Sequence, residues 1–271
     1  MRAVIAYEWS FDPFVTIPLA LSGVFYIVGI RVLWRRSPAE LQGWQAACFA
    51  GGWIALFVVL VTPPHEIGRH LFTAHMIEHE VLMAVAAPLL ALSRPVVALG
   101  SALQARWLER LQVSAQSRWI SLPWSWLIRP LNATLLHGAV IWIWHTPRLF
   151  DAAVMDPTVH RLQHATFFFT ALLFWWALFR GARRHLGAGA IHIAFTMVHT
   201  SILGALIALS PRLLYVAQTK DAPAFGLSPL EDQQLGGLIM WVPAGAVYAA
   251  AALALVGFWI RAREHATSYA E

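Results

Sequence analysis

Apolar runs long enough to cross a membrane recur along this chain, and they constrain its fold more than any other feature. A helix needs about twenty consecutive apolar residues to span the hydrocarbon core, and a segment in lipid must pair its own backbone groups, which favours helices. Seven runs with few charges meet this requirement: roughly 14–34, 44–62, 71–92, 127–146, 160–180, 189–209 and 236–260. We therefore expect an all-α fold, a polytopic membrane helix bundle with seven transmembrane helices.

Composition supports the same class of protein. Hydrophobic residues make up 59% of the chain and charged residues 12%, against about 25% charged residues in ordinary soluble domains. The seven runs leave no room for a sizeable soluble domain, so residues 1–271 are predicted to form a single integral membrane domain. The sequence pI near 10.0 would suit nucleic acid in a soluble protein, but in a membrane protein the location of each charge matters more. We expect contact with the lipid bilayer and none with nucleic acid.

The distribution of basic residues predicts the orientation. Loops on one side of the predicted bundle collect 13 arginines, and those on the other side collect 6 arginines and lysines. The positive-inside rule then places the N-terminus outside and the C-terminus in the cytoplasm. Glu8 and Asp12 precede the first apolar run where a signal peptide would carry basic residues, so we expect this run to remain as a helix.

A helix lying on the cytoplasmic surface is predicted between the third and fourth spans. Leu99, Leu103, Trp107 and Leu111 follow one another at i+4 spacing, with arginines nearby. Apolar residues on one helix face beside basic residues are typical of interfacial helices. An ordinary loop helix without a membrane role remains an equal alternative.

Histidines supply the strongest indication of function. Threading the seven spans places seven of the twelve histidines at or near the outer face: His65, His70, His75, His79, His145, His160 and His164. Four of these form two i, i+4 pairs, at 75/79 and 160/164, in spans that enter the bilayer from the same side. An imidazole in hydrocarbon is costly without a partner. We therefore predict one metal site with ligands from His75, His79, His145, His160 and His164.

Other residues have supporting roles in this prediction, each with a structural alternative. Glu78 shares the face of His75 and can orient a ligand ring. Met76 and Met240 lie near the outer face as soft ligands or packing residues. Asp232, with the neighbouring glutamine, either gates access and docks a partner or caps a helix start.

Five further histidines lie at other depths of the predicted bundle. His137 and His199 fall near mid-membrane, where they form either a second tier of the site or an interhelical hydrogen-bond network. His185, His192 and His265 belong to the cytoplasmic half or the tail, and we exclude them from the site.

Spacing alone does not select the metal. Imidazole serves zinc, copper, iron and nickel, and Cys48, the only cysteine, excludes a Cys-x-x-Cys site. A histidine site open to the oxidising outer side is compatible with copper. The His-x-x-Glu-His spacing of residues 75–79 is an inverted zinc-hydrolase motif in which Glu78 would be the base. Paired histidines on facing helices would also suit haem.

Several segments together resemble a known family. They are HMIEH at 75–79, APLL at 87–90, WHTP at 144–147, the 160–176 stretch, DQQLGG at 232–237 and MWVP at 240–243. Over about residues 60–250 the chain is similar to the polytopic CtaG family of caa-type cytochrome c oxidase assembly factors. The resemblance implies a multi-pass protein of the bacterial plasma (inner) membrane that helps copper reach the catalytic subunit of a haem-copper oxidase.

The resulting hypothesis is a non-enzymatic assembly factor whose outward-facing histidine cluster holds copper and whose partners are cytochrome c oxidase subunits. Two alternatives stay open from the residues alone: a membrane-embedded zinc-dependent hydrolase and a haem-binding membrane electron carrier.

Overall fold

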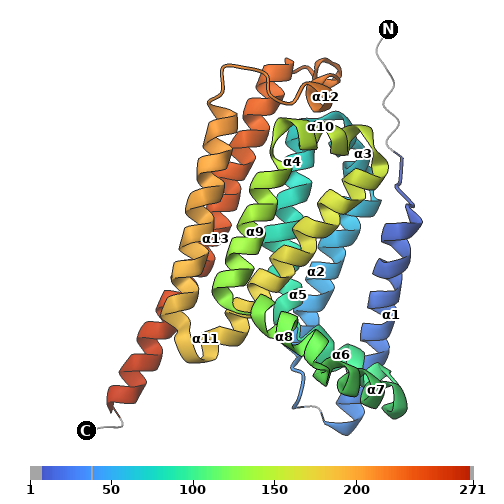
Figure 1. Cartoon of the computed structure of the whole chain (residues 1–271), viewed down its shortest axis with the longest axis vertical. Helices are drawn as coiled ribbons and strands as arrows, with labels where there is room; N and C mark the ends of the chain where they lie inside the picture. Colours follow the sequence, from blue (N-terminus) through green and yellow to red (C-terminus); the bar gives the residue numbers. More distant parts are fainter. Residues whose placement is uncertain (1–7, 38, 269–271) are drawn as a thin grey trace.

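The computed structural model describes residues 8–37 and 39–268, except for the side chains of 181–185 and 263–268, and it contains no strand in this part of the chain. The helices, shown in Figure 1, are α1 (Pro13–Arg36), α2 (Gly43–Val61), α3 (Pro63–His70), α4 (Phe72–Glu80), the π-helix η1 (Val81–Ala86), α5 (Ala87–Leu92), α6 (Pro95–Ala102), α7 (Ala105–Gln116), α8 (Arg118–Leu127), α9 (Pro130–Trp144), α10 (Pro147–Met155), α11 (Pro157–Ala208), α12 (Val216–Thr219), the 3-10 helix η2 (Ala222–Phe225) and α13 (Pro229–Ser268). The predicted all-α class is confirmed.

Six of the described stretches are long and apolar enough to cross a membrane. They are 13–36, 43–61, 72–92, 157–180, 186–208 and 229–262, which match six of the seven predicted spans. The remaining prediction, 127–146, contains α9, a helix of 15 residues. At 1.5 Å per residue α9 is about 22 Å long, which is shorter than the hydrocarbon core of about 30 Å.

Helix α11 folds back on itself and supplies two arms of the bundle (Figure 1). Contacts with α9 show that the arms run in opposite directions. In the first arm, Thr166 accepts a hydrogen bond from Trp144, at the end of α9. In the second arm, His192 lies 3.1 Å from Thr134, near the start of α9. The backbone stays helical through the bend of α11, so the two predicted spans, 160–180 and 189–209, are joined without a loop.

Small residues let the second arm of α11 approach α13 closely. A Cβ atom added to Gly204 would lie 2.7 Å from the backbone nitrogen of Trp241, and Gly237 meets the backbone of Ala208 in the same way. Membrane helices associate through such small residues because lipid supplies no hydrophobic driving force between them. This contact holds the last helix against the bundle.

The third membrane-crossing stretch is interrupted by the π-helix η1 between α4 and α5. Pro88 follows η1 and cannot donate a backbone hydrogen bond, so a local change of helical register accommodates it. The indole nitrogen of Trp175 donates a hydrogen bond of 2.9 Å to the carbonyl of Met83 within η1. Because π-turns are frequent at functional sites, it is notable that η1 directly follows the helix carrying His75 and His79.

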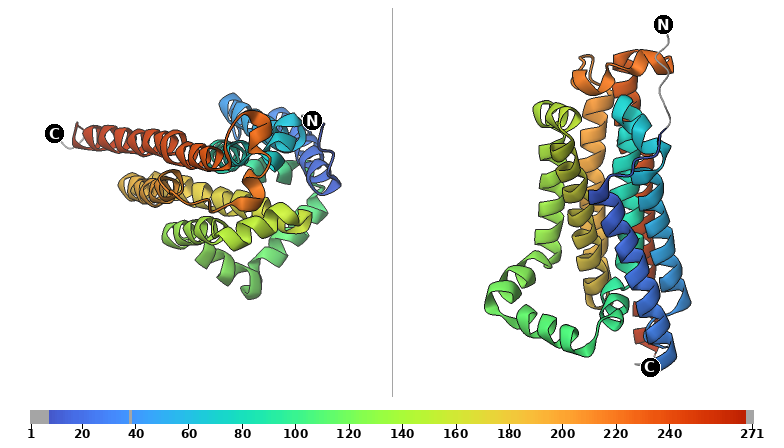
Figure 2. Two further views of the ribbon diagram at one scale, coloured as in Figure 1. Left: turned by 90° about the horizontal axis from the view of Figure 1, so that it is seen from above. Right: turned by 90° about the vertical axis from the view of Figure 1, so that its right-hand side faces the viewer.

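The two ends of the bundle carry different short helices (Figures 1 and 2). Helices α3, α10 and α12 lie at one end, and α6, α7 and α8 lie at the other. The predicted single stack from Leu99 to Leu111 is broken, because Leu103 has an extended backbone that ends α6 before α7 begins. Neither α7 nor α8 contains a buried residue. Their apolar side chains are therefore free to face lipid.

Candidate metal centre

Four of the predicted ligands come from the first turns of two neighbouring elements. His75 and His79 lie on α4, and His160 and His164 lie on the first arm of α11. The i, i+4 spacing puts each pair on one face of its helix, and the two faces are directed at each other. The starts of both helices lie at the end of the bundle that carries α3, α10 and α12 (Figure 1).

His75, His160 and His164 form the centre of the cluster. One ring nitrogen from each lies within 4.8 Å of the others. Their ring centroids are 5.3 Å apart for His75 and His160 and 4.2 Å apart for His160 and His164. Since zinc or copper binds imidazole nitrogen at about 2 Å, small side-chain movements bring three nitrogens onto one ion.

His79 and His145 extend the cluster deeper into the bundle. The His79 ring lies 4.3 Å from that of His75 and 5.0 Å from that of His164. The His145 ring is 6.2 Å from that of His79. Nδ1 of His145 donates to the carbonyl of Ile141 at 2.7 Å. That bond fixes the tautomer and leaves the Nε2 lone pair free.

A carboxylate connects the cluster to the loop helix α3. One oxygen of Glu78 lies 3.2 Å from Nδ1 of His65, and the other lies 3.8 Å from Nε2 of His164. Burial opposes protonation of His65, yet the hydrogen bond and charge of Glu78 raise the pKa of this histidine. Glu78 thus hydrogen-bonds His65 and lies close to His164 without bonding it; carboxylates commonly orient histidines around metal sites in this way.

Buried nitrogens without a partner show that the donor set fits a cation. Both ring nitrogens of His75 and of His79, and Nε2 of His145 and His164, are buried and make no hydrogen bond within the described structure. Leaving a buried polar atom unpaired costs about 1–3 kcal/mol. A metal ion is the ligand that would use several converging imidazole lone pairs at once.

Aromatic rings pack against the cluster from two sides, Phe150 from α10 at the loop end and Phe167 from α11. Phe150 packs 5.3 Å from His75, and Phe167 packs 4.6 Å from His79, both measured between ring centroids. Both phenylalanines are fully buried. The histidine face beside these rings is therefore dry, whereas His65, on the α3 side, keeps a side chain that is 13% exposed.

The predicted methionine and acidic residues have other contacts. Met76 is buried against Gly236 of α13, and Met240 lies in the hydrophobic core with its backbone against Gly204. Asp232 is fully buried, and its carboxylate accepts hydrogen bonds of 2.8 and 2.9 Å from the amides of Phe72 and Thr73. Asp232 therefore caps the start of α4 and fixes the helix that carries two histidines.

His137 and His199 each make a hydrogen bond between α9 and α11, apart from the cluster. Nδ1 of His137 lies 3.1 Å from the hydroxyl of Thr170, which itself donates to the carbonyl of Thr166. His137 therefore donates, and its Nε2 keeps a lone pair. Nδ1 of His199 accepts from Trp142 at 3.3 Å, so its Nε2 carries the proton. Nε2 of each ring is buried without a partner in the described structure, so each histidine makes one hydrogen bond to the neighbouring helix and none to the other histidine.

Sequence reasoning misses one feature of the site. His65 is predicted at the outer face and outside the ligand set, yet its ring lies 5.7 Å from that of His160. Glu80, which directly follows His79, has one buried carboxyl oxygen without a partner in the described structure, and no contact joins it to the cluster histidines. Of the excluded histidines, His192 bonds Thr134, whereas the side chains of His185 and His265 lie outside the described residues.

Comparison with known proteins then identifies the group to which this arrangement belongs. The family model of the cytochrome c oxidase caa3 assembly factor matches residues 24–262. The chain belongs to this family. All five predicted histidine ligands lie within the matched range. The predicted family resemblance is confirmed.

Curated relatives are longer than this chain. An uncharacterized protein of Mycobacterium leprae is 26% identical over 279 residues, covering 93% of this chain and 40% of the relative. An uncharacterized protein of Mycobacterium bovis is 26% identical over 273 residues, covering 93% of this chain and 39% of the relative. The chain thus spans about two fifths of the length of these relatives. No solved structure gives a significant match.

Proposed function

We propose that the chain holds copper transiently on its histidine cluster and transfers it to a subunit of cytochrome c oxidase during assembly. The observation that carries the proposal is the approach of His75, His160 and His164, whose ring nitrogens lie within 4.8 Å of one another. Copper is the cargo in this proposal, and no reaction is catalysed.

The donor set supports transient rather than permanent binding. Imidazole nitrogens bind copper well, and the single cysteine of the chain lies on α2, outside the cluster. His65 and Glu78 stand at the α3 side of the cluster, where they can exchange places with a ligand during transfer. Family membership supports the oxidase as the recipient.

The proposal includes a topology of seven spans with the N-terminus outside and the C-terminus in the cytoplasm. In this arrangement α9 crosses the membrane together with the residues at its two ends. Its hydrogen bonds to both arms of α11 keep it inside the bundle. The arginine-rich end with α6, α7 and α8 faces the cytoplasm, and these helices lie at the interface. The histidine cluster then opens to the outer side of the bacterial plasma membrane.

Metal binding is tested first with purified full-length protein. The double variant His75→Ala/His164→Ala removes two central ligands, and His192→Ala is the control because His192 contacts Thr134 on the other side of the bundle. The copper content after dialysis against a weak chelator is expected to fall in the double variant and to stay at the wild-type level in the control. Equal copper content in all three proteins would refute the site.

The cellular role is tested separately. A deletion strain should contain less active oxidase with unchanged transcript levels, and added copper should restore part of the activity. The double variant should fail to complement the deletion, whereas His192→Ala should complement it. Purified protein that retains zinc, or shows the Soret absorption of haem, with normal oxidase in the deletion strain would replace this proposal with the corresponding alternative.

A further inference from the structure

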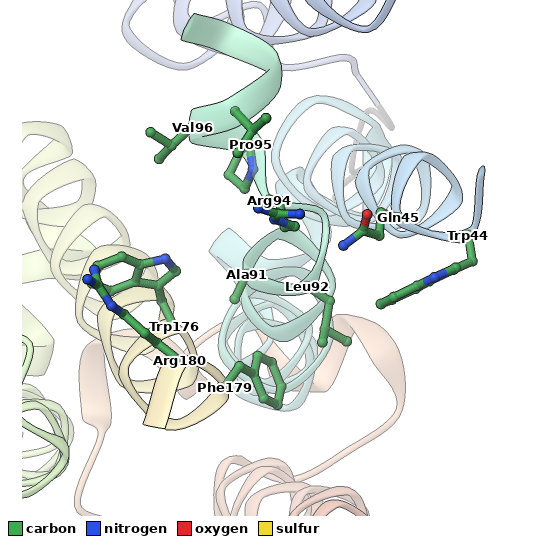
Figure 3. A pocket seen from close by; sticks show the side chains of 11 residues that line it. Trp44, Gln45, Ala91, Leu92, Arg94, Pro95, Val96, Trp176, Phe179 and Arg180 are labelled. Atoms are coloured by element: carbon green, nitrogen blue, oxygen red, sulfur yellow. The ribbon is translucent and has the colours of Figure 1, made fainter. Parts of the chain in front are cut away.

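A cavity of about 540 Å³ lies at the end of the bundle opposite the histidines (Figure 3). It is bounded by the start of α2, the end of α5, the start of α6 and the end of the first arm of α11. Figure 3 shows Trp44 and Gln45 on one side, Trp176 and Arg180 on the other, and Arg94 between them. Nothing in the oxidase-assembly role uses this cavity.

Two guanidinium groups face the cavity from different elements. Arg180 lies 5.2 Å from the ring centroid of Trp176, a cation–π contact that holds it beside the opening. Arg94 donates a hydrogen bond of 3.0 Å to the carbonyl of Glu40, which leaves its other N–H groups free to bind a ligand. Arginine presents its donors in a planar fork that matches phosphate oxygens.

The backbone of Arg94 is strained. Its φ and ψ are both 52°, and it is the one described non-glycine residue with a positive φ. A left-handed conformation costs a residue with a Cβ atom roughly 1 kcal/mol, and glycine would adopt it freely. Besides its hydrogen bond to Glu40, an arginine at this turn places a cation in the mouth of the cavity. Strain of this kind often marks a ligand-binding position.

The lining of the cavity has two chemical parts. The mouth carries Arg94 and Arg180, and no aspartate or glutamate occurs among its lining residues. The remainder of the wall is apolar and comes from Ala91, Leu92, Val96, Val97 and Phe179. A ligand that satisfies both parts has an anionic head and a hydrocarbon body.

The depth of the cavity identifies that ligand further. Helix α2 begins at Gly43, α5 ends at Leu92 and the apolar part of the first arm ends at Arg180, so three membrane-crossing stretches end here. Exposed tryptophans, including Trp44 and Trp124, surround this level of the bundle. Tryptophan is enriched where hydrocarbon meets the headgroups. The cavity mouth therefore lies at the level of lipid phosphates.

We propose that this cavity binds an anionic phospholipid. Its phosphodiester pairs with Arg94 and Arg180, and an acyl chain lies along Val96 and Val97 on α6. Basic pockets between membrane helices on the cytoplasmic side are suited to such lipids. The bound lipid would join α6 to the first arm of α11.

Native mass spectrometry of the delipidated full-length protein tests the proposal. Phosphatidylglycerol and phosphatidylcholine are titrated in separate arms, and a third arm adds millimolar inorganic phosphate to the phosphatidylglycerol complex. The variant is Arg94→Gln/Arg180→Gln. The control, Arg106→Gln/Arg110→Gln, removes the same charge from α7, where both arginines lie over Trp107 and outside this cavity.

Phosphatidylglycerol is expected to bind the wild type and the control alike, and its affinity should fall about tenfold or more in the variant, because two charge-assisted contacts are lost. A second variant, Val96→Trp, narrows the apolar wall without changing charge and should also weaken binding. Thermal unfolding checks that each variant is folded. Equal affinity in variant and control, equal binding of phosphatidylcholine, or displacement by inorganic phosphate would overturn the proposal.

Discussion

Glu78 lies 3.2 Å from His65, a residue thirteen positions earlier in the chain, so the helix that carries the histidine pair is tied to the loop helix in front of it. The same carboxylate faces His164 from its other oxygen, at 3.8 Å. Glu78 is 2% exposed and is therefore little screened by solvent. One side chain thus joins α3, α4 and α11 at the mouth of the candidate copper site.

Replacing Glu78 with glutamine should weaken copper binding without unfolding the protein. Glutamine keeps the shape and can still hydrogen-bond, but it loses the charge that orients the imidazoles. Removing a carboxylate of this kind typically lowers metal affinity about 10–100-fold. Competition with a chromophoric chelator measures the change. Glu66→Gln is the matched control, because Glu66 pairs with Arg69 and His70 on α3; an equal loss in both variants would contradict the assigned role.

Gly68→Ala should displace the carboxylate of Glu78 through a close contact from α3. A Cβ atom at this position would lie 2.8 Å from the carboxyl carbon of Glu78 and 2.9 Å from one of its oxygens. Alanine favours α3 itself by about 1 kcal/mol, so a loss of copper affinity without a loss of helix would report displacement of Glu78. Gly43→Ala is the control, because nothing lies within 4 Å of its added Cβ. Unchanged affinity in Gly68→Ala would show that the carboxylate position is unimportant.

Helical periodicity predicts the part of the site that consists of histidine pairs on single helices. The spacing of His75 and His79, and of His160 and His164, places each pair on one helix face wherever the helices lie. His65 has no such pattern, because its position depends on how α3 folds over α4. Asp232 was assigned to its own helix start or to a partner, whereas it caps α4 from 160 residues away. Contacts of that range require the packing of the bundle.

Hydropathy predicted the spans better than their connections. Apolar length is a local property, and the bounds of α2 and of the 72–92 stretch agree with the predicted runs within one residue. The bend of α11 and the break between α6 and α7 are not visible in hydropathy. Leu103 and its neighbours form a helical pattern in sequence, yet the backbone at Leu103 is extended.

Gly204→Ala should destabilise the contact between α11 and α13. The added Cβ would lie 2.7 Å from the backbone nitrogen of Trp241, and backbone cannot move aside as a side chain does. Overpacking of this kind costs about 1–3 kcal/mol, and the expected result is a lower midpoint of thermal unfolding in detergent. Gly257→Ala, on α13 with nothing within 4 Å of its added Cβ, should leave the midpoint unchanged or raise it. A wild-type midpoint in Gly204→Ala would contradict the close approach.

The ion pair between Asp12 and Arg161 should make stability depend on pH in the acid range. Nε of Arg161 lies 2.6 Å from the Asp12 carboxylate, which also caps α1 through the amide of Phe14. Burial alone would raise the pKa of Asp12, but the guanidinium and the amide outweigh it and lower the pKa below 3.8. A carboxyl with a lowered pKa stabilises the folded state above its unfolded pKa and loses this contribution as the pH falls through the folded value.

Asp12→Asn should therefore be less stable than the wild type at neutral pH. The difference should begin to shrink only below about pH 4 and should vanish as the pH falls through the lowered pKa of Asp12. Asparagine retains the helix cap, so the difference reports the ion pair, worth about 0.5–1 kcal/mol because Arg161 is partly exposed. Arg161→Gln and the double variant complete a cycle of thermal unfolding midpoints measured from pH 3 to pH 8. A double variant whose loss equals the sum of the two single losses, or a difference between Asp12→Asn and the wild type that does not shrink as the pH falls from 4 to 3, would show that the two residues do not stabilise the fold as a pair.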